Sequence, residues 1–348
     1  MSIQIPDTPS AFVDVEGPSS GETDRVQGGS TASFPGKFLQ QLAQRDRFLY
    51  DQALGGDDVA IASFATFKQA GIASLAQGRL TLETGIPVSS VNQVAKTTLY
   101  YTPYNGDVVA LFDTVNSRWD AFNFSELGLS LSGLAADTNH DIFLYNNNGT
   151  LTMQAVAWSD SSAGSSVRAS AITQLNGIWV KDSDKRRYLG TIRITGTPGQ
   201  CEDSFAKRFV WNSANRAPRK LFDEDDTTHT YNVSTYRPWN NSTSACRVEF
   251  VYGLATELVA GTSNIVYTLG DGQTVCALNT TTDPGGNSPN VDFATQYNVV
   301  STSNASSVLS GRSEIPPLGF NYFLALENTA GSITTTFNLA KLSGTIFN

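Results

Sequence analysis

The sequence is poor in the residues that most often carry metal, redox and acid–base chemistry. Its 348 residues include two histidines and three cysteines. The cysteines, Cys201, Cys246 and Cys276, are widely spaced, and no pair has the C-x-x-C spacing of a redox or metal site. We therefore expect three reduced thiols in or near β-sheet cores, and neither a bound metal ion nor a cofactor.

Charged residues and long apolar runs are also scarce. Charged residues make up 16% of the chain, whereas an average globular protein has about 25%. The formal net charge is −9, and an acidic chain repels phosphate backbones, so we expect no nucleic-acid partner. No apolar run approaches the ~18 residues of a transmembrane helix, and residues 1–6 are too polar for a secretory signal. We therefore expect no membrane insertion.

Turn-forming residues are abundant instead, and they indicate a mainly β fold. Alternating apolar segments flank Asn-Gly pairs at 105–106, 148–149 and 176–177, and an Asp-Gly pair at 271–272. Each pair predicts a β-hairpin, because both central residues of a type I′ turn need positive φ.

The spacing of these signals predicts two antiparallel β-sandwich or barrel-like domains. The first spans residues 96–222 and the second residues 247–348, with a linker or loop region at 223–246 and a short β connector at 59–95. A single larger β domain fits the same pattern, and the sequence leaves this alternative open.

Two segments without β character precede these domains. Residues 1–35 read as an extended attachment arm, because they combine several prolines with little apolar periodicity. Its apolar anchors for docking are Ile3, Ile5, Phe12, Val13 and Val15. Residues 36–58 predict an amphipathic helix that packs either on copies of itself or on the β domain. Its apolar face includes Phe38, Leu39, Leu42 and Leu49.

No catalytic motif is present, so we expect a protein that is not an enzyme. His140 and His229 belong to no recognised metal or nucleophile pattern. The acidic run at 223–226 offers carboxylates that suit Ca²⁺, but it lacks the spaced ligand order of a calcium loop and predicts a solvated loop.

The most distinctive local feature is both basic and aromatic. It predicts an interface or a glycan-binding patch, because arginine and aromatic residues are enriched at protein interfaces. Alternatively, the arginines pair with local aspartates and the tryptophan of the Pro-Trp-Asn loop is a packing plug. The candidate residues are Arg186, Arg187, Tyr188, Trp211 and Trp239.

Two stretches resemble proteins of tailed bacteriophages. Residues 37–49, Lys-Phe-Leu-Gln-Gln-Leu-Ala-Gln-Arg-Asp-Arg-Phe-Leu, are similar to a short helix of tail-fibre and baseplate-associated proteins. Residues 99–221 resemble a β module of phage structural proteins. The residues that carry this second resemblance are Pro103-Tyr104-Asn105-Gly106, Trp119, residues 141–145, residues 186–191 and residues 209–212.

The resemblance implies a virion appendage, a tail fibre or a fibre attached to the baseplate or capsid. Such a protein is a homotrimer on the particle surface. Its arm docks on other virion structural proteins, and its β domains contact a neighbouring protein or a host-surface glycan. The chain lacks the repetitive shaft of long fibres. The alternatives are a polysaccharide-degrading tail spike, a tail adaptor, a capsid decoration protein and a cellular carbohydrate-binding or adhesion module.

Overall fold

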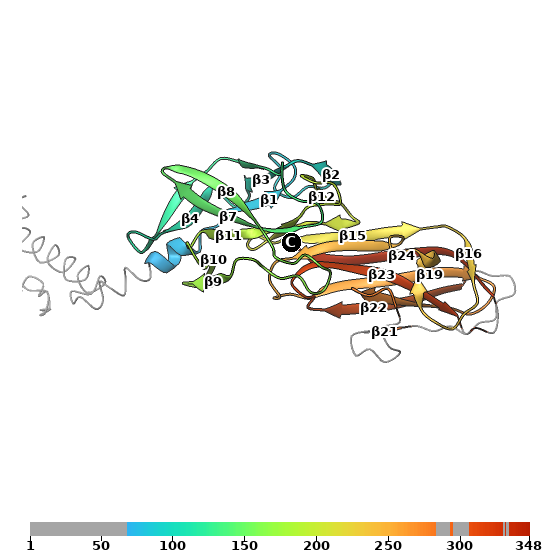
Figure 1. Cartoon of the computed structure of the whole chain (residues 1–348). Helices are drawn as coiled ribbons and strands as arrows, with labels where there is room; N and C mark the ends of the chain where they lie inside the picture. Colours follow the sequence, from blue (N-terminus) through green and yellow to red (C-terminus); the bar gives the residue numbers. More distant parts are fainter. Residues whose placement is uncertain (1–67, 283–292, 295–305, 330, 332–333) are drawn as a thin grey trace, which may run out of the picture. The chain divides into compact units, whose positions relative to one another are not determined.

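The computed structural model describes residues 68–282, 293–294, 306–329, 331 and 334–348. The chain divides into Met1–Ile72 and Ala73–Asn348, and the second part is hereafter the β unit. The predicted arm, the predicted helix at 36–58 and their contact residues lie outside the described residues. Residues 68–73 are helical, and the β unit is mainly β, as the sequence predicted (Figure 1). Its strands pair antiparallel except for Lys207–Arg208 and Arg247–Tyr252, which pair parallel.

A sandwich of two sheets forms the C-terminal part of the β unit (Figure 1). In the first sheet the order is β15 (Pro218–Asp225), β24 (Thr335–Phe347), β19 (Val259–Thr268), β22 (Ser306–Glu314) and β21 (Phe293–Ala294), with β16 (His229–Tyr231) also on β24. In the second sheet the order is β17 (Arg237–Pro238), β23 (Gly319–Thr329), β18 (Arg247–Tyr252), β13 (Lys207–Arg208), β12 (Cys201–Asp203) and β2 (Gln93–Lys96), with β20 (Gly272–Leu278) on β23. A short 3₁₀ helix, η1 (Trp239–Asn241), follows β17.

Smaller sheets form the N-terminal part of the β unit. One has the order β8 (Thr150–Ala157), β7 (Asn139–Asn147), β11 (Arg187–Arg193), β10 (Ile178–Lys181) and β9 (Ile172–Leu175), with β14 (Val210–Asn212) on β11. Another has the order β1 (Gly78–Thr81), β3 (Thr98–Pro103) and β6 (Leu127–Ser130). The hairpin of β4 (Val108–Asp113) and β5 (Arg118–Asn123) completes the set.

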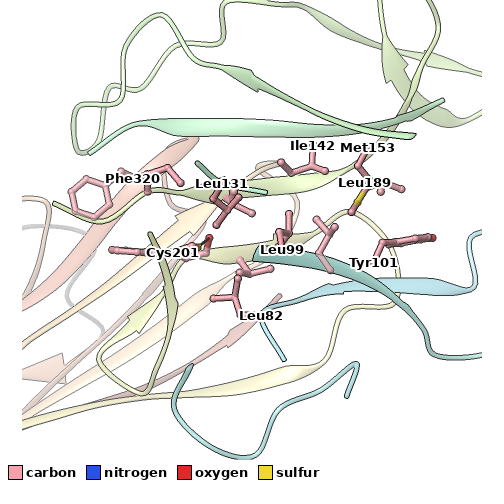
Figure 2. Packing of buried hydrophobic residues seen from close by; sticks show 14 of the residues in the cluster. Leu82, Leu99, Tyr101, Leu131, Ile142, Met153, Leu189, Cys201 and Phe320 are labelled. Carbon is pink, nitrogen blue, oxygen red and sulfur yellow. Dashed lines mark hydrogen bonds between the residues drawn. The ribbon is translucent and has the colours of Figure 1, made fainter. Parts of the chain in front are cut away.

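The strand β23 joins the two hydrophobic cores of the β unit. Its side chains alternate between them, as strand geometry requires: Phe320, Tyr322, Leu324 and Leu326 belong to one core, and Phe323 and Ala325 to the other. Figure 2 shows Phe320 together with Leu99, Leu131 and Cys201 in the first core. The shared strand explains why the predicted boundary at residue 222 falls inside a continuous strand, β15, which pairs with β24 along its whole length.

The predicted hairpins at 148–149 and 176–177 are confirmed. The first joins β7 to β8 and the second joins β9 to β10. In both turns the asparagine and the glycine have positive φ, with values of 50° and 95° in the first and 52° and 81° in the second. This is the backbone geometry that an Asn-Gly pair favours.

The predicted hairpin at 105–106 is wrong, because another segment takes the place between its strands. Gln77 accepts a backbone hydrogen bond from Tyr104 at 2.8 Å and donates one to Val108 at 3.0 Å. The backbone of Gln77 thereby bonds to the residue after β3 and to the first residue of β4, and these two strands lie in different sheets. The hairpin predicted at 271–272 is also wrong, since β19 and β20 lie in opposite sheets of the sandwich.

The three cysteines are free and buried, as predicted. Burial raises the pKa of each thiol, and it raises the pKa of Cys276 to about 12. Within the described ranges, no helix is both long and apolar enough to cross a membrane.

Candidate ligand-binding groove

Three hairpin turns of the β unit surround an open groove of about 440 Å³. The turn between β4 and β5, the turn between β7 and β8, and the segment between β10 and β11 each contribute residues. Pockets of roughly 300–1,000 Å³ are the usual size of small-molecule sites. The lining residues are Leu111, Phe112, Asp113, Thr114, Val115, Asp120, Phe122, Leu144, Tyr145, Asn146, Asn148, Asp184, Lys185, Arg186 and Arg187.

The guanidinium group of Arg186 lies over an aromatic ring at the groove wall. Its central carbon is 3.9 Å from the ring centroid of Tyr145 on β7. Gln154 on β8 accepts a hydrogen bond from Arg186 Nη1 at 2.6 Å, and Asp184 pairs with Arg186 Nε at 3.1 Å. The three partners fix the rotamer of a long side chain, so the groove has a preorganised planar donor surface.

Arg187 contributes a second guanidinium group to the groove lining, and this residue is 4% exposed. Its Nη1 donates hydrogen bonds to the carbonyl oxygens of Ala73 and Ala110, each at 2.9 Å. Burial lowers the pKa of Arg187 to about 10. Among the described residues, no carboxylate forms an ion pair with it. The groove is lined by three cationic and three carboxylate side chains, so the formal charges of its lining cancel. These residues are Lys185, Arg186 and Arg187, and Asp113, Asp120 and Asp184.

The carboxylates at the rim are held by local partners. Asp113 accepts hydrogen bonds from the side chain and backbone of Asn116, and these lower its pKa. Asp120 pairs with Arg118 at 3.0 Å, and Asp184 pairs with Lys181 at 3.1 Å. Each of these carboxylates therefore already has a partner within its own hairpin.

The structure does not assemble the patch that the sequence predicted. Arg186 lines the groove, but Tyr188, Trp211 and Trp239 are 2%, 0% and 0% exposed. Trp211 lies against Tyr188 at a ring distance of 6.4 Å, and the cation over its ring is Arg216. All three aromatic rings fill the core: Tyr188 and Trp211 lie in strands that are buried on both faces, and Trp239 lies in η1.

Trp239 is the packing plug that the sequence left as an alternative. Its ring meets the imidazole of His229 edge-on at 4.6 Å and lies 5.8 Å from the ring of Phe337 on β24. The Pro-Trp-Asn segment thus covers one edge of the sandwich core. It offers no aromatic surface to a ligand.

The acidic run at 223–226 was predicted to be a solvated loop, but its first three residues belong to the strand β15. Alternation separates its side chains: Asp223 accepts the backbone N–H of Arg247 at 2.9 Å, and Glu224 pairs with Lys341 at 3.4 Å. Adjacent strand residues point to opposite faces, so these carboxylates do not converge on one ion. In the described part of the chain, no group of three or more His, Cys, Asp or Glu residues could hold a metal ion.

Sequence reasoning missed Tyr145, Gln154 and Phe112 as candidates for the site. They come from three different strands, and each alone looks like an ordinary strand residue. The one usable signal was the clustering of hairpin turns, because loops at one end of a rigid sheet often form binding sites. The sequence gives no means of deciding which turns meet.

The chain has no clear counterpart among known proteins. No protein-family model and no curated protein matches it. Among solved structures it is similar to dimeric latent PorU from Porphyromonas gingivalis, with 8% identity and a TM-score of 0.23. That match covers 79% of this chain and 25% of PorU, so the chain spans about a quarter of that protein.

Two structures of a viral particle are also similar in part. The match to the infectious bursal disease virus Gx strain has 12% identity and a TM-score of 0.15, and it covers 79% of this chain and 82% of that one. The match to T=1 particles derived from infectious bursal virus has 11% identity and a TM-score of 0.13, with 79% and 80% covered. At these TM-scores none of the three matches carries an argument about function.

Proposed function

We propose that this chain is a non-enzymatic structural protein of a phage particle, a fibre that docks by its N-terminal arm. It displays the β unit for assembly or for binding the host surface. The assignment to a virion rests on the two sequence resemblances. The observation that supports host binding is the groove, which three hairpin turns build on a rigid sheet scaffold.

The chemistry of the groove suits a glycan of the host surface. Sugar rings have apolar faces that stack on aromatic side chains and hydroxyl groups that pair with planar donors and acceptors. Tyr145 and Arg186 supply both kinds of surface in one stacked pair, and Phe112 and Phe122 add apolar wall. One such site binds weakly, and a fibre with several copies gains affinity through multivalency.

The groove is tested by replacing Tyr145 with alanine in the full-length chain. This change removes the aromatic surface and the support of Arg186, so we expect binding on an array of bacterial surface polysaccharides to weaken about tenfold. Lys341→Ala is the matched control, because Lys341 is about half exposed on β24 and does not line the groove. Unchanged binding by Tyr145→Ala would exclude the groove as the glycan site. Cleavage of a bound polysaccharide would favour the tail-spike alternative.

The fibre assignment predicts a homotrimer in solution. Light scattering of the full-length chain should give three times the chain mass of 37.4 kDa. A variant lacking residues 1–54 then locates the assembly contacts: loss of the trimer places them in that segment, and retention places them in the β unit. A monomer for the full-length chain would contradict the fibre and favour an adaptor or decoration protein.

A further inference from the structure

Cationic side chains gather around a single carboxylate where β1, β12, β13 and β15 meet. Asp203 on β12 pairs with Arg208 Nη1 at 2.8 Å and with Arg219 Nη2 at 3.1 Å. Arg79 on β1 is close enough that the charge of Arg219 contributes to lowering its pKa. Lys220 follows Arg219 in β15 and is exposed. The cluster therefore holds four positive charges and one negative charge.

The remaining donors of the three arginines are paired mainly with backbone carbonyl groups. Arg79 donates to the carbonyl oxygen of Pro87 at 2.9 Å, Arg208 to that of Lys220 at 2.9 Å, and Arg219 to that of Ser89 at 2.6 Å. Carbonyl dipoles satisfy hydrogen bonds but bring no net charge. Among the side chains of the cluster, Asp203 is the one counter-charge to these cations, and Nη2 of Arg79 also donates to the backbone oxygen of Asn348 at 2.6 Å.

Burial raises the free-energy cost of this excess positive charge. Arg79, Arg208 and Arg219 are 3%, 2% and 7% exposed. Burial lowers the pKa of Arg79 to about 10, and the neighbouring charge of Arg219 adds to that effect. Burial also lowers the pKa of Arg219, against the attraction of Asp203. Buried charges of one sign normally need partners of the other sign.

An open pocket of about 180 Å³ lies directly on this cluster. It is several times larger than the ~30 Å³ that one water molecule occupies in the liquid. Arg219 Nε, on a side chain that lines the pocket, is buried and has no hydrogen-bond partner among the described residues. The lining residues are Ser89, Ser90, Val91, Phe205, Arg208, Pro218, Arg219 and Lys220.

We propose that this pocket binds a tetrahedral oxyanion, phosphate or sulfate, between Arg208, Arg219 and Lys220. Nε of Arg219 can donate to one oxygen of such an anion, both guanidinium groups add their positive charge, and the lysine adds a mobile point charge. A divalent anion brings the cluster close to neutrality. No residue of the pocket lines the groove near Tyr145, so this site is independent of the proposed glycan groove.

The site is tested by calorimetric titration of the full-length chain with sodium phosphate and sodium sulfate, at an ionic strength held constant with chloride. We expect saturable binding and a rise in the unfolding temperature, because the anion binds the folded state alone. Lys220→Met should weaken binding about tenfold. Lys207→Met is the matched control, because Lys207 lies on β13, is partly exposed, pairs with Glu202 and does not line the pocket.

The result that overturns the proposal is a titration with phosphate or sulfate that shows no saturable binding. An equal loss in both lysine variants also overturns it, because the effect is then one of net charge. Acetate that binds as tightly as phosphate would reassign the pocket to a carboxylate and contradict the tetrahedral anion. A titration with glucose 1-phosphate distinguishes a free anion from an anion carried on a glycan. Tighter binding than inorganic phosphate supports an anion carried on a glycan, and equal binding supports a free anion.

Discussion

Replacing Glu327 with glutamine is expected to lower the free energy of unfolding by about 3 kcal/mol, which is the usual cost of removing one partner from a buried ion pair. Glu327 on β23 is 0% exposed. Its carboxylate accepts hydrogen bonds from His229 Nε2 at 2.6 Å and from Arg237 Nε at 2.7 Å. His229 lies in β16 of one sheet and Arg237 in β17 of the other, so this carboxylate joins the two sheets.

Urea unfolding of the full-length chain measures this loss. Glu224→Gln is a suitable control, because Glu224 on β15 is about half exposed and pairs with Lys341, which is also about half exposed. We expect the control to change the free energy of unfolding by less than about 1 kcal/mol, as for a surface pair. An equally small loss for Glu327→Gln would show that the carboxylate does not hold the sheets together.

The contact between Glu327 and His229 also makes the stability of the β unit depend on pH. Burial lowers the pKa of His229, but the hydrogen bonds to Glu327 and to the carbonyl of Thr227 outweigh it, so the net pKa lies above its usual value of 6.5. The negative charge of Asp225 favours the protonated imidazole, whereas the positive charge of Arg237 lowers the pKa of His229. A raised folded-state pKa gives stability that is complete below the unfolded pKa and is lost as the pH rises through the folded one.

We therefore expect the free energy of unfolding of His229→Gln to fall less than that of the wild type as the pH rises above about 6.5. The other histidine, His140, supplies the contrast, because burial lowers its pKa and its contribution is lost on acidification instead. Unfolding curves of the wild type and of His229→Gln across this pH range check the assignment. A wild-type stability that does not fall as the pH rises, or that falls equally in His229→Gln, would contradict it.

Replacing Trp211 with alanine is expected to lower the free energy of unfolding by about 4 kcal/mol. The indole is 0% exposed and lies 5.9 Å from the ring of Tyr252 in edge-on contact. Gly253 is required beside it, since a Cβ at this position would lie 2.3 Å from the indole ring. Alanine leaves a cavity in a close-packed core, and this cavity adds to the cost of the lost contacts.

Leu258→Ala is the control for this prediction, because Leu258 is 59% exposed and its truncation should cost less than about 0.5 kcal/mol. Chemical unfolding of both variants compares them directly. A Trp211→Ala protein of unchanged stability that fails to bind glycan would restore the interface interpretation of this tryptophan. The predicted outcome is the reverse, with lost stability and binding that follows the folded fraction.

The turn at 148–149 and the turn at 105–106 show how far local sequence reaches. Both are Asn-Gly pairs between apolar alternations. The first closes a hairpin, because nothing enters between its strands. At the second, the segment containing Gln77 enters between β3 and β4, and this long-range pairing has no signature within either strand. Local pattern specifies a turn, and the partner across the turn depends on the rest of the chain.

The sequence by itself determined the mainly β class, two of the hairpins and the reduced, buried state of the cysteines, because these depend on composition and on a few adjacent residues. The tertiary structure alone decided which turns surround the groove and which arginines share Asp203. It also decided that Tyr188, Trp211 and Trp239 are core residues. The physical reason is strand pairing across long sequence separations, which sets the face of each side chain and brings together charges that the sequence holds far apart.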